Sequence, residues 1–179
     1  YEIAVPSNLG RGLWDAILEA GGEFGIEAYG TEALHVLRAE KGFIVIGDET
    51  DGTVTPYDVG LDGLVSKKKT DFIGKRSLEQ SFLKSDGRKQ LVGLLTDDPQ
   101  EVLPDGAHAV RDETSKTTIG HVTSSYYSPP LNRSIAMALI DNGRARMGET
   151  LKFPLDGKTV TAKIADPVFY DREGARQNA

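Results

Sequence analysis

The sequence predicts an α+β protein in two parts, residues 1–86 and residues 87–179. Before Asp86, helical and strand-like patterns are mixed, whereas after it nearly every apolar segment is short, β-like and bounded by turn residues. The polar run Ser85-Asp86-Gly87-Arg88 separates the two patterns and marks the expected boundary. A succession of short strands predicts a small barrel or sandwich for the second part.

The first part is expected to contain helices and short strands. Leu13, Trp14, Ile17 and Leu18 form one apolar stripe at helical spacing, which predicts a helix whose Trp14 packs into a core and which ends at Gly21-Gly22. The other expected elements are strands at 1–5, 26–29 and 43–46 and helices from Thr31 to about Gly42 and from Lys75 to Lys84.

The second part is expected to consist of strands and turns. Val160, Ala162 and Ile164 alternate with polar residues, as in a half-buried strand, and Asp156-Gly157 just before them is a strong hairpin signal. The expected strands are 91–96, 107–111, 118–124, 135–140, 150–153 and 159–164.

Composition excludes several classes of function. With no cysteine among 179 residues, the chain has no disulfide framework, no cysteine-ligated zinc and no thiol nucleophile. A net charge of -6 argues against nucleic-acid binding, and no segment reaches the length of a membrane helix, so we expect a cytoplasmic protein without membrane partners. The one tight basic run, Lys67-Lys68-Lys69, is either a solvated loop or a contact for a polyanionic tail.

No short sequence motif indicates a catalytic site. His35, His108 and His121 lack partners at metal-ligand spacing, so no metal site is predicted and the three are expected to be structural or exposed. The acidic run Gly47–Gly52 fails the EF-hand pattern and is interpreted as a loop. Catalytic residues therefore stay unassigned on residue chemistry alone.

Two charged residues have both a structural and a ligand-binding interpretation. Glu2 is either solvated or points into a pocket, where a carboxylate accepts paired hydrogen bonds from an amidine-like ring edge such as that of a pterin. Arg38 either pairs with Glu32 or Glu40 on a helix surface or anchors the carboxylate of a ligand.

Five segments in order resemble the folate-dependent aminomethyltransferase family, typified by the glycine cleavage T-protein. Each segment alone is weak, but their combination and order are specific, and they span nearly the whole chain. They are Tyr1-Glu2-Ile3, Leu37-Arg38-Ala39-Glu40-Lys41-Gly42, Thr55-Pro56-Tyr57-Asp58-Val59-Gly60-Leu61, Asp71-Phe72-Ile73-Gly74-Lys75 and Gly120-His121-Val122-Thr123-Ser124-Ser125-Tyr126-Tyr127-Ser128-Pro129-Pro130-Leu131.

The resemblance implies a ferredoxin-like portion of a folate-binding domain, followed by a C-terminal antiparallel β-barrel. It also implies tetrahydrofolate as the cofactor, with Glu2 holding the pterin ring and Arg38 as a second folate contact. The T-protein branch has an A-R-D triplet where this chain has Ala33, Leu34 and His35, so one pterin-contacting arginine is replaced. The catalytic aspartate of the family belongs to a region that this sequence does not contain.

Details of the variant segments resemble the α subunits of heterotetrameric sarcosine oxidases. The implied function is to support oxidative demethylation of sarcosine with one-carbon transfer to tetrahydrofolate, with flavin and NAD bound elsewhere in the enzyme. The chain is expected to be a piece of a longer polypeptide, partnered by the remaining N-terminal part and by other oxidase subunits, and inactive alone. The alternatives are a fragment of a glycine cleavage T-protein and a non-catalytic folate-fold interaction module.

Overall fold

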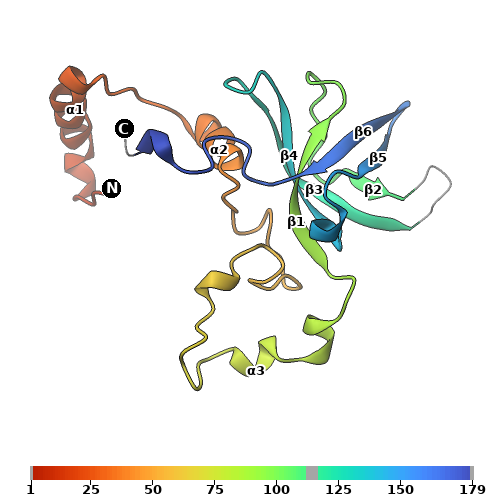
Figure 1. The fold of residues 1–179 in the computed structure, drawn as a ribbon. Helices are drawn as coiled ribbons and strands as arrows, with labels where there is room; N and C mark the ends of the chain where they lie inside the picture. The colour runs from red at the N-terminus through yellow and green to blue at the C-terminus, as the bar shows by residue number, and fades with distance from the viewer. Residues whose placement is uncertain (1, 112–116, 178–179) are drawn as a thin grey trace. The chain divides into compact units, whose positions relative to one another are not determined.

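A computed structural model describes residues 2–111 and 117–177, and it divides the chain into two compact units, Tyr1–Leu34 and His35–Ala179. Helix α2, Thr31–Glu40, contains the point of division (Figure 1). The α+β fold class is confirmed, because helices in the first half precede a closed antiparallel barrel in the second.

The first unit is built around helix α1, Gly10–Gly21, which confirms the helix expected from the apolar stripe. Short 3-10 turns, η1 (Ser7–Leu9) and η2 (Gly22–Phe24), lie on either side of α1. The expected strands at 1–5 and 26–29 do not form: residues 2–5 and 26–29 pair with no described strand. A strand needs a neighbour for its backbone hydrogen bonds, and these segments have none among the described residues.

The segment between α2 and the barrel is mostly irregular. At 43–46 the expected strand is reduced to an isolated bridge between Ile46 and Thr50. The expected helix at 75–84 is split into α3, Lys75–Leu78, and the 3-10 turn η4, Ser81–Lys84, with an earlier 3-10 turn η3 at Asp62–Leu64. Short helices without a packed apolar face do not propagate, which explains the split.

All six strands expected in the second part are confirmed, with somewhat different ends. They form a closed antiparallel barrel in the order β1-β4-β3-β2-β5-β6 (Figure 1). The Asp156-Gly157 hairpin is also confirmed, because Leu155 pairs with Lys158 and Gly157 has a φ of 75°. The strands are β1 (Lys89–Thr96), β2 (His108–Val110), β3 (Thr118–Ser128), β4 (Arg133–Asp141), β5 (Thr150–Leu155) and β6 (Lys158–Ala165).

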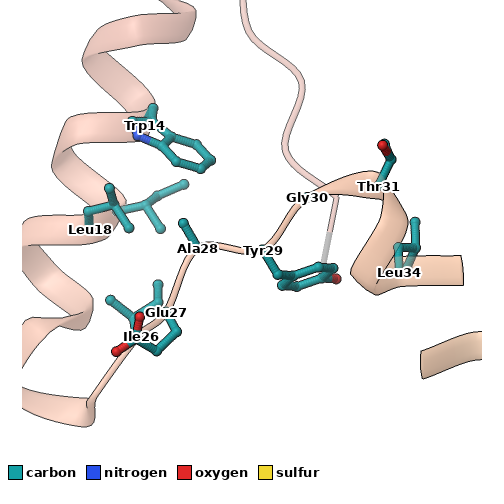
Figure 2. A pocket seen from close by; sticks show the side chains of 10 residues that line it. Trp14, Leu18, Ile26, Glu27, Ala28, Tyr29, Gly30, Thr31 and Leu34 are labelled. Carbon is teal, nitrogen blue, oxygen red and sulfur yellow. The ribbon is translucent and has the colours of Figure 1, made fainter. Parts of the chain in front are cut away.

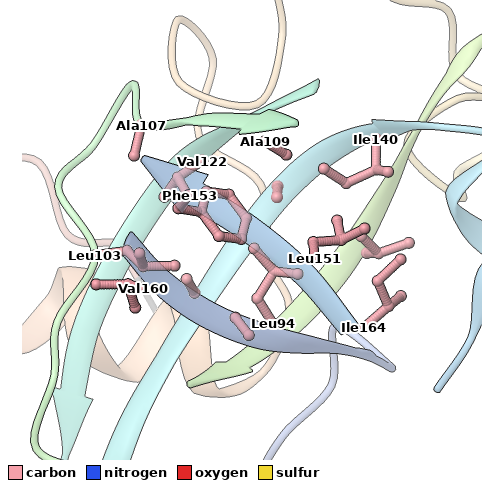
Figure 3. Packing of buried hydrophobic residues seen from close by; sticks show 14 of the residues in the cluster. Leu94, Leu103, Ala107, Ala109, Val122, Ile140, Leu151, Phe153, Val160 and Ile164 are labelled. Atoms are coloured by element: carbon pink, nitrogen blue, oxygen red, sulfur yellow. The ribbon is translucent and has the colours of Figure 1, made fainter. Parts of the chain in front are cut away.

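Strand β4 is buried on both faces and joins two hydrophobic clusters. Its alternate residues Ala136, Ala138 and Ile140 belong to the larger cluster, which also contains Phe153, residues of the other strands, and Leu103 and Ala107 between β1 and β2 (Figure 3). The residues between them pack in a second cluster that includes Ala39 of α2. The outer face of the barrel thus has its own core, which fixes the end of α2 against the sheet.

Candidate functional site

Arg38 lies in a buried polar cluster between the end of α2 and strand β3. Its Nη1 donates a hydrogen bond to Glu49 Oε2 at 2.8 Å, and its Nη2 donates to Ser124 Oγ at 2.5 Å. A second carboxylate, Asp48, accepts from Nη2 at the longer distance of 3.3 Å. The predicted helix-surface pair with Glu32 or Glu40 is wrong, because the guanidinium turns inward and its partners lie in the following loop.

Glu49 is the fully buried acceptor at the centre of this cluster. Besides the bond from Arg38, Oε2 accepts the Val45 backbone N–H at 2.8 Å. Its other oxygen accepts from the hydroxyls of Thr123 and Ser124 on β3, at 2.8 and 2.5 Å. A buried carboxylate with four donors is well compensated, so the cluster holds together the helix end, the loop and the barrel wall.

Glu40 makes a second link between α2 and β3. Its Oε1 accepts a hydrogen bond from Ser128 Oγ at 2.7 Å, and its backbone oxygen accepts the N–H groups of Phe169 and Tyr170. Two of the segments that carried the sequence resemblance, around Arg38 and around Ser124, therefore contact each other directly. Their joint presence has a structural reason in this fold.

The segment around Thr55 and Asp58 is anchored in the same way to the start of the barrel. Asp58 Oδ2 accepts the backbone N–H and the hydroxyl of Thr55 at 2.7 and 2.8 Å, while Oδ1 accepts from Arg88 Nε at 2.9 Å. Burial alone would raise the pKa of Asp58, but the hydrogen bond from Arg88 and those from Thr55 lower it below its usual range. This motif therefore has a structural role, because it fixes the segment around Thr55 and Asp58 to Arg88 at the start of the barrel.

Replacing Asp58 by asparagine is expected to lower the free energy of unfolding at pH 7 by about 1.5–3 kcal/mol, because hydrogen bonds to a charged group are lost. A carboxyl with a lowered folded-state pKa contributes stability above its unfolded pKa, and this contribution disappears as the pH falls through the folded-state value. The variant should therefore lose less stability than the wild type below about pH 4.

Urea unfolding from pH 2 to pH 7 measures this difference, with Asp86→Asn as the control. Asp86 is exposed and forms no ion pair with another described residue. If the free energy of unfolding falls by the same amount between pH 7 and pH 2 in the wild type and in Asp58→Asn, the ionised Asp58 carboxylate does not stabilise the fold as proposed.

Glu2 lies in the first unit, where it is exposed and forms no ion pair with another described residue. Arg38 belongs to the second unit. The structure thus places the two predicted folate contacts in separately described units, and their roles in ligand binding stay predictions.

The first unit also has an apolar hollow of about 340 Å³ beside α1. Trp14 and Leu18 of α1 lie across from Ala28 and Tyr29 (Figure 2). The expectation that Trp14 packs in a core is wrong for the described residues, since its side chain is 54% exposed. Leu34 also lines this hollow with its apolar side chain. The hollow suits a flat ring or another apolar surface.

The histidines form ring contacts. His35 stacks on Tyr126 with ring centroids 6.4 Å apart, and His108 meets His121 edge to face at the same distance. In the described part of the chain, no three His, Asp or Glu side chains gather as a metal ion would require. No helix of that part has the length and apolar character needed to span a bilayer.

Sequence reasoning missed Glu49. The acidic run at 47–52 is a loop, as its sequence indicates, but one of its carboxylates faces inward to Arg38. An arginine that ends an apolar helix face signals that a buried acid is needed. Nothing in the sequence tells which of several nearby acids supplies it.

Comparisons of the sequence and of the structure with known proteins agree on one family. Residues 1–69 match the family described as the GCVT N-terminal domain, and residues 89–171 match the glycine cleavage T-protein C-terminal barrel domain. The aminomethyltransferase T of the glycine cleavage system from Bartonella henselae superposes with a TM-score of 0.80 and 26% identity, over 94% of this chain and 45% of that one. The chain belongs to the glycine cleavage T-protein family.

Within this family the chain resembles part of the sarcosine oxidase α subunit. It is 50% identical to that subunit from Corynebacterium sp. (strain P-1) over 99% of this chain, and 42% identical to that from Rhizobium meliloti (strain 1021) over 98%. The aminomethyltransferase of Desulfitobacterium hafniense (strain DSM 10664 / DCB-2) is 37% identical over 97% of this chain and 46% of its own length. This chain spans only 19% of the Corynebacterium protein and 18% of the Rhizobium protein.

Proposed function

We propose that the chain is the folate-binding portion of a sarcosine oxidase α subunit. The observation that carries this proposal is the 50% identity to such a subunit over 99% of this chain. The enzyme would demethylate sarcosine oxidatively, with flavin and NAD bound outside this chain. Tetrahydrofolate supplies nitrogen nucleophiles that accept the released one-carbon unit, and the residues of this chain would bind and orient it.

Glu2 is proposed to hold the pterin ring. A carboxylate accepts two parallel hydrogen bonds from the 2-amino-pyrimidinone edge, a geometry that a neutral side chain reproduces poorly. Glu2 is exposed and forms no ion pair with a described residue, which leaves both oxygens available to a ligand.

Arg38 is proposed as a second folate contact, either directly or by fixing its neighbours. Five described protein groups already accept from its two terminal nitrogens: Glu49, Asp48, Ser124, the Phe43 carbonyl and the Met137 sulfur. Its Nε is buried and has no hydrogen-bond partner among the described residues. Its contacts therefore favour a positioning role, and the two roles differ in what a substitution should change.

Titration calorimetry with folinic acid, a stable reduced folate, tests the site. Glu2→Gln is expected to weaken binding by about 10- to 100-fold, because charge-assisted hydrogen bonds to the pterin edge are lost. Glu23→Gln, an exposed glutamate of the same unit, is the control and should bind as the wild type does. Equal affinities for Glu2→Gln and the wild type would remove Glu2 from the site.

Arg38→Lys completes the experiment. A direct folate contact predicts weaker folinic acid binding in a variant that is still folded, whereas a positioning role predicts a lower melting temperature with the affinity of the folded fraction retained. Absence of folinic acid binding to the wild-type chain would contradict the proposal that this portion alone holds folate.

The remaining part of the same polypeptide and other oxidase subunits are the proposed partners. The sarcosine oxidase α subunits are about five times longer than the matched region, so much of such an enzyme would lie outside this chain. In the first unit, Trp14, Phe24, Tyr29 and Leu34 are exposed, an apolar surface of the kind that marks a protein interface. Accordingly, we expect this chain alone to oxidise no sarcosine.

A fragment of an aminomethyltransferase is the second candidate function. The 37% identity to the Desulfitobacterium hafniense protein and the Bartonella henselae structure favour it. Leu34 and His35 argue against it, since they replace two residues of the A-R-D triplet. Transfer of an aminomethyl group from a lipoyl carrier protein, assayed after the remainder of the polypeptide is added, separates the two candidates.

A further inference from the structure

Two buried hydroxyl groups at one end of the barrel have a feature that none of the preceding functions uses. Thr96, the last residue of β1, is 2% exposed, and Ser134, near the start of β4, is 1% exposed. Neither Thr96 Oγ1 nor Ser134 Oγ has a hydrogen-bond partner among the described residues. A buried polar group without a partner costs free energy, so two of them in one place indicate a bound polar ligand.

The register of the barrel places these two residues opposite each other. Strand β1 pairs antiparallel with β4 as far as Leu94 and Ala136, which both belong to the larger hydrophobic cluster. Two residues further along, Thr96 therefore lies opposite Ser134, and both side chains point to the same face of the sheet as that cluster. Facing residues of an antiparallel pair have Cβ atoms about 4.5–5.5 Å apart, a separation that one small bridging molecule can span.

The backbones of the two strands are not bonded to each other at this point. The Ser134 backbone N–H donates to the Pro99 carbonyl at 2.7 Å. The Thr96 carbonyl accepts from Nη2 of Arg133, also at 2.7 Å. Both backbone groups thus bond outside the ladder, and a ligand between the two hydroxyls would join the strands where the ladder ends.

Water is the ligand that suits this site. A hydroxyl both donates and accepts hydrogen bonds, and so does water, which can therefore satisfy the two oxygens at once. The guanidinium of Arg133 is bonded to the Thr96 carbonyl, and its positive charge opposes a metal cation at the same place. The nearly complete burial of both side chains excludes a larger ligand from the bulk solvent.

We propose that Thr96 Oγ1 and Ser134 Oγ hold one ordered water molecule between β1 and β4. The water satisfies both hydroxyls and takes over the role of a ladder bond between the strand ends. It is thus a structural ligand of the barrel, and it contributes to closure of the barrel wall and not to folate binding.

The sign of a stability change tests this proposal. Thr96→Val keeps nearly the same shape and leaves the water with one hydroxyl partner, so the melting temperature is expected to fall by about 2–4 °C, as for the loss of one hydrogen bond in a chain of this size. Ser134→Ala should have a similar effect. The exposed Thr159 of β6 provides the control, because Thr159→Val should melt close to the wild type.

The opposite sign would overturn the inference. If the Thr96 hydroxyl has no partner at all, its replacement by a methyl group removes the free-energy cost of burying it. Thr96→Val would then melt at the same temperature as the wild type or at a higher one.

Oxygen-17 relaxation dispersion detects the water itself, because it counts the water molecules that stay inside a protein longer than the protein takes to tumble. The double variant Thr96→Val/Ser134→Ala is expected to hold one long-lived water fewer than the wild type, and Thr159→Val should keep the wild-type number. An unchanged number in the double variant would overturn the inference, since the two hydroxyls would then bond to each other. A wild-type melting temperature that differs between Na⁺ and K⁺ at equal ionic strength would also overturn it, since the ligand would then be a cation.

Discussion

Replacing Glu49 by alanine is expected to lower the free energy of unfolding of the second unit by about 3–5 kcal/mol, the usual effect of removing one partner from a buried ion pair. The side chain is fully buried and accepts hydrogen bonds from Arg38, Val45, Thr123 and Ser124. Without it, the buried Arg38 guanidinium keeps only one carboxylate among the described residues, Asp48 at the longer distance of 3.3 Å. Urea unfolding followed by circular dichroism measures the loss.

The matched control is Glu149→Ala. Glu149 also pairs with an arginine, Arg146, but its side chain is 47% exposed, so its removal should cost no more than about 1 kcal/mol. A double-mutant cycle of Arg38→Leu and Glu49→Leu should show that the two changes together cost less than their sum. Additive effects would mean that the pair contributes no coupling energy and that the cluster is held by packing alone.

Gly120→Ala is expected to destabilise the barrel by about 3 kcal/mol or more, because steric overlap and backbone strain act together. A Cβ atom at this position would lie 2.2 Å from the Leu139 carbonyl oxygen and 2.7 Å from Cδ1 of Ile140. The φ of Gly120 is +152°, which side-chain-bearing residues rarely adopt. The neighbour is backbone of the paired strand β4, so it cannot move without breaking the β3–β4 register.

Gly63→Ala serves as the comparison for this variant. It lies in the 3-10 turn η3 with no atom within 4 Å of an added Cβ, and its stability should stay within about 0.5 kcal/mol of the wild type. Thermal unfolding by calorimetry compares the two variants directly. Similar melting temperatures for them would show that β3 and β4 separate at Gly120 more easily than the structure indicates.

The barrel was predictable because each of its strands carries a local pattern that needs no distant information. Alternation at Val160, Ala162 and Ile164, and the turn residues Asp156-Gly157, specify strand and hairpin within a few positions. Strand β4 reads as a continuous apolar run because both of its faces are covered. The strand patterns alone left a barrel and a sandwich open, and the strand order came only from the structure, since pairing joins residues far apart in the sequence.

The first half was less predictable for a related reason. The helices at Gly10–Gly21 and Thr31–Glu40 follow from local periodicity and form as expected. The strands expected at 1–5, 26–29 and 43–46 do not form in the described residues, because a strand-like sequence becomes a strand only when a partner supplies its hydrogen bonds. Trp14 is exposed for a similar reason, because a side chain is buried only when other residues cover it.

The sequence by itself determined the α+β class, the six barrel strands, two helices and a set of motifs specific enough to indicate the family. Only the tertiary structure decided what those motifs do. It turned Arg38 inward to Glu49, joined Glu40 to Ser128 and bound Asp58 to Thr55 and Arg88. The physical reason is the range of the interactions: helix and strand periodicity act between near neighbours, whereas burial and ion pairing are settled by groups that folding brings together.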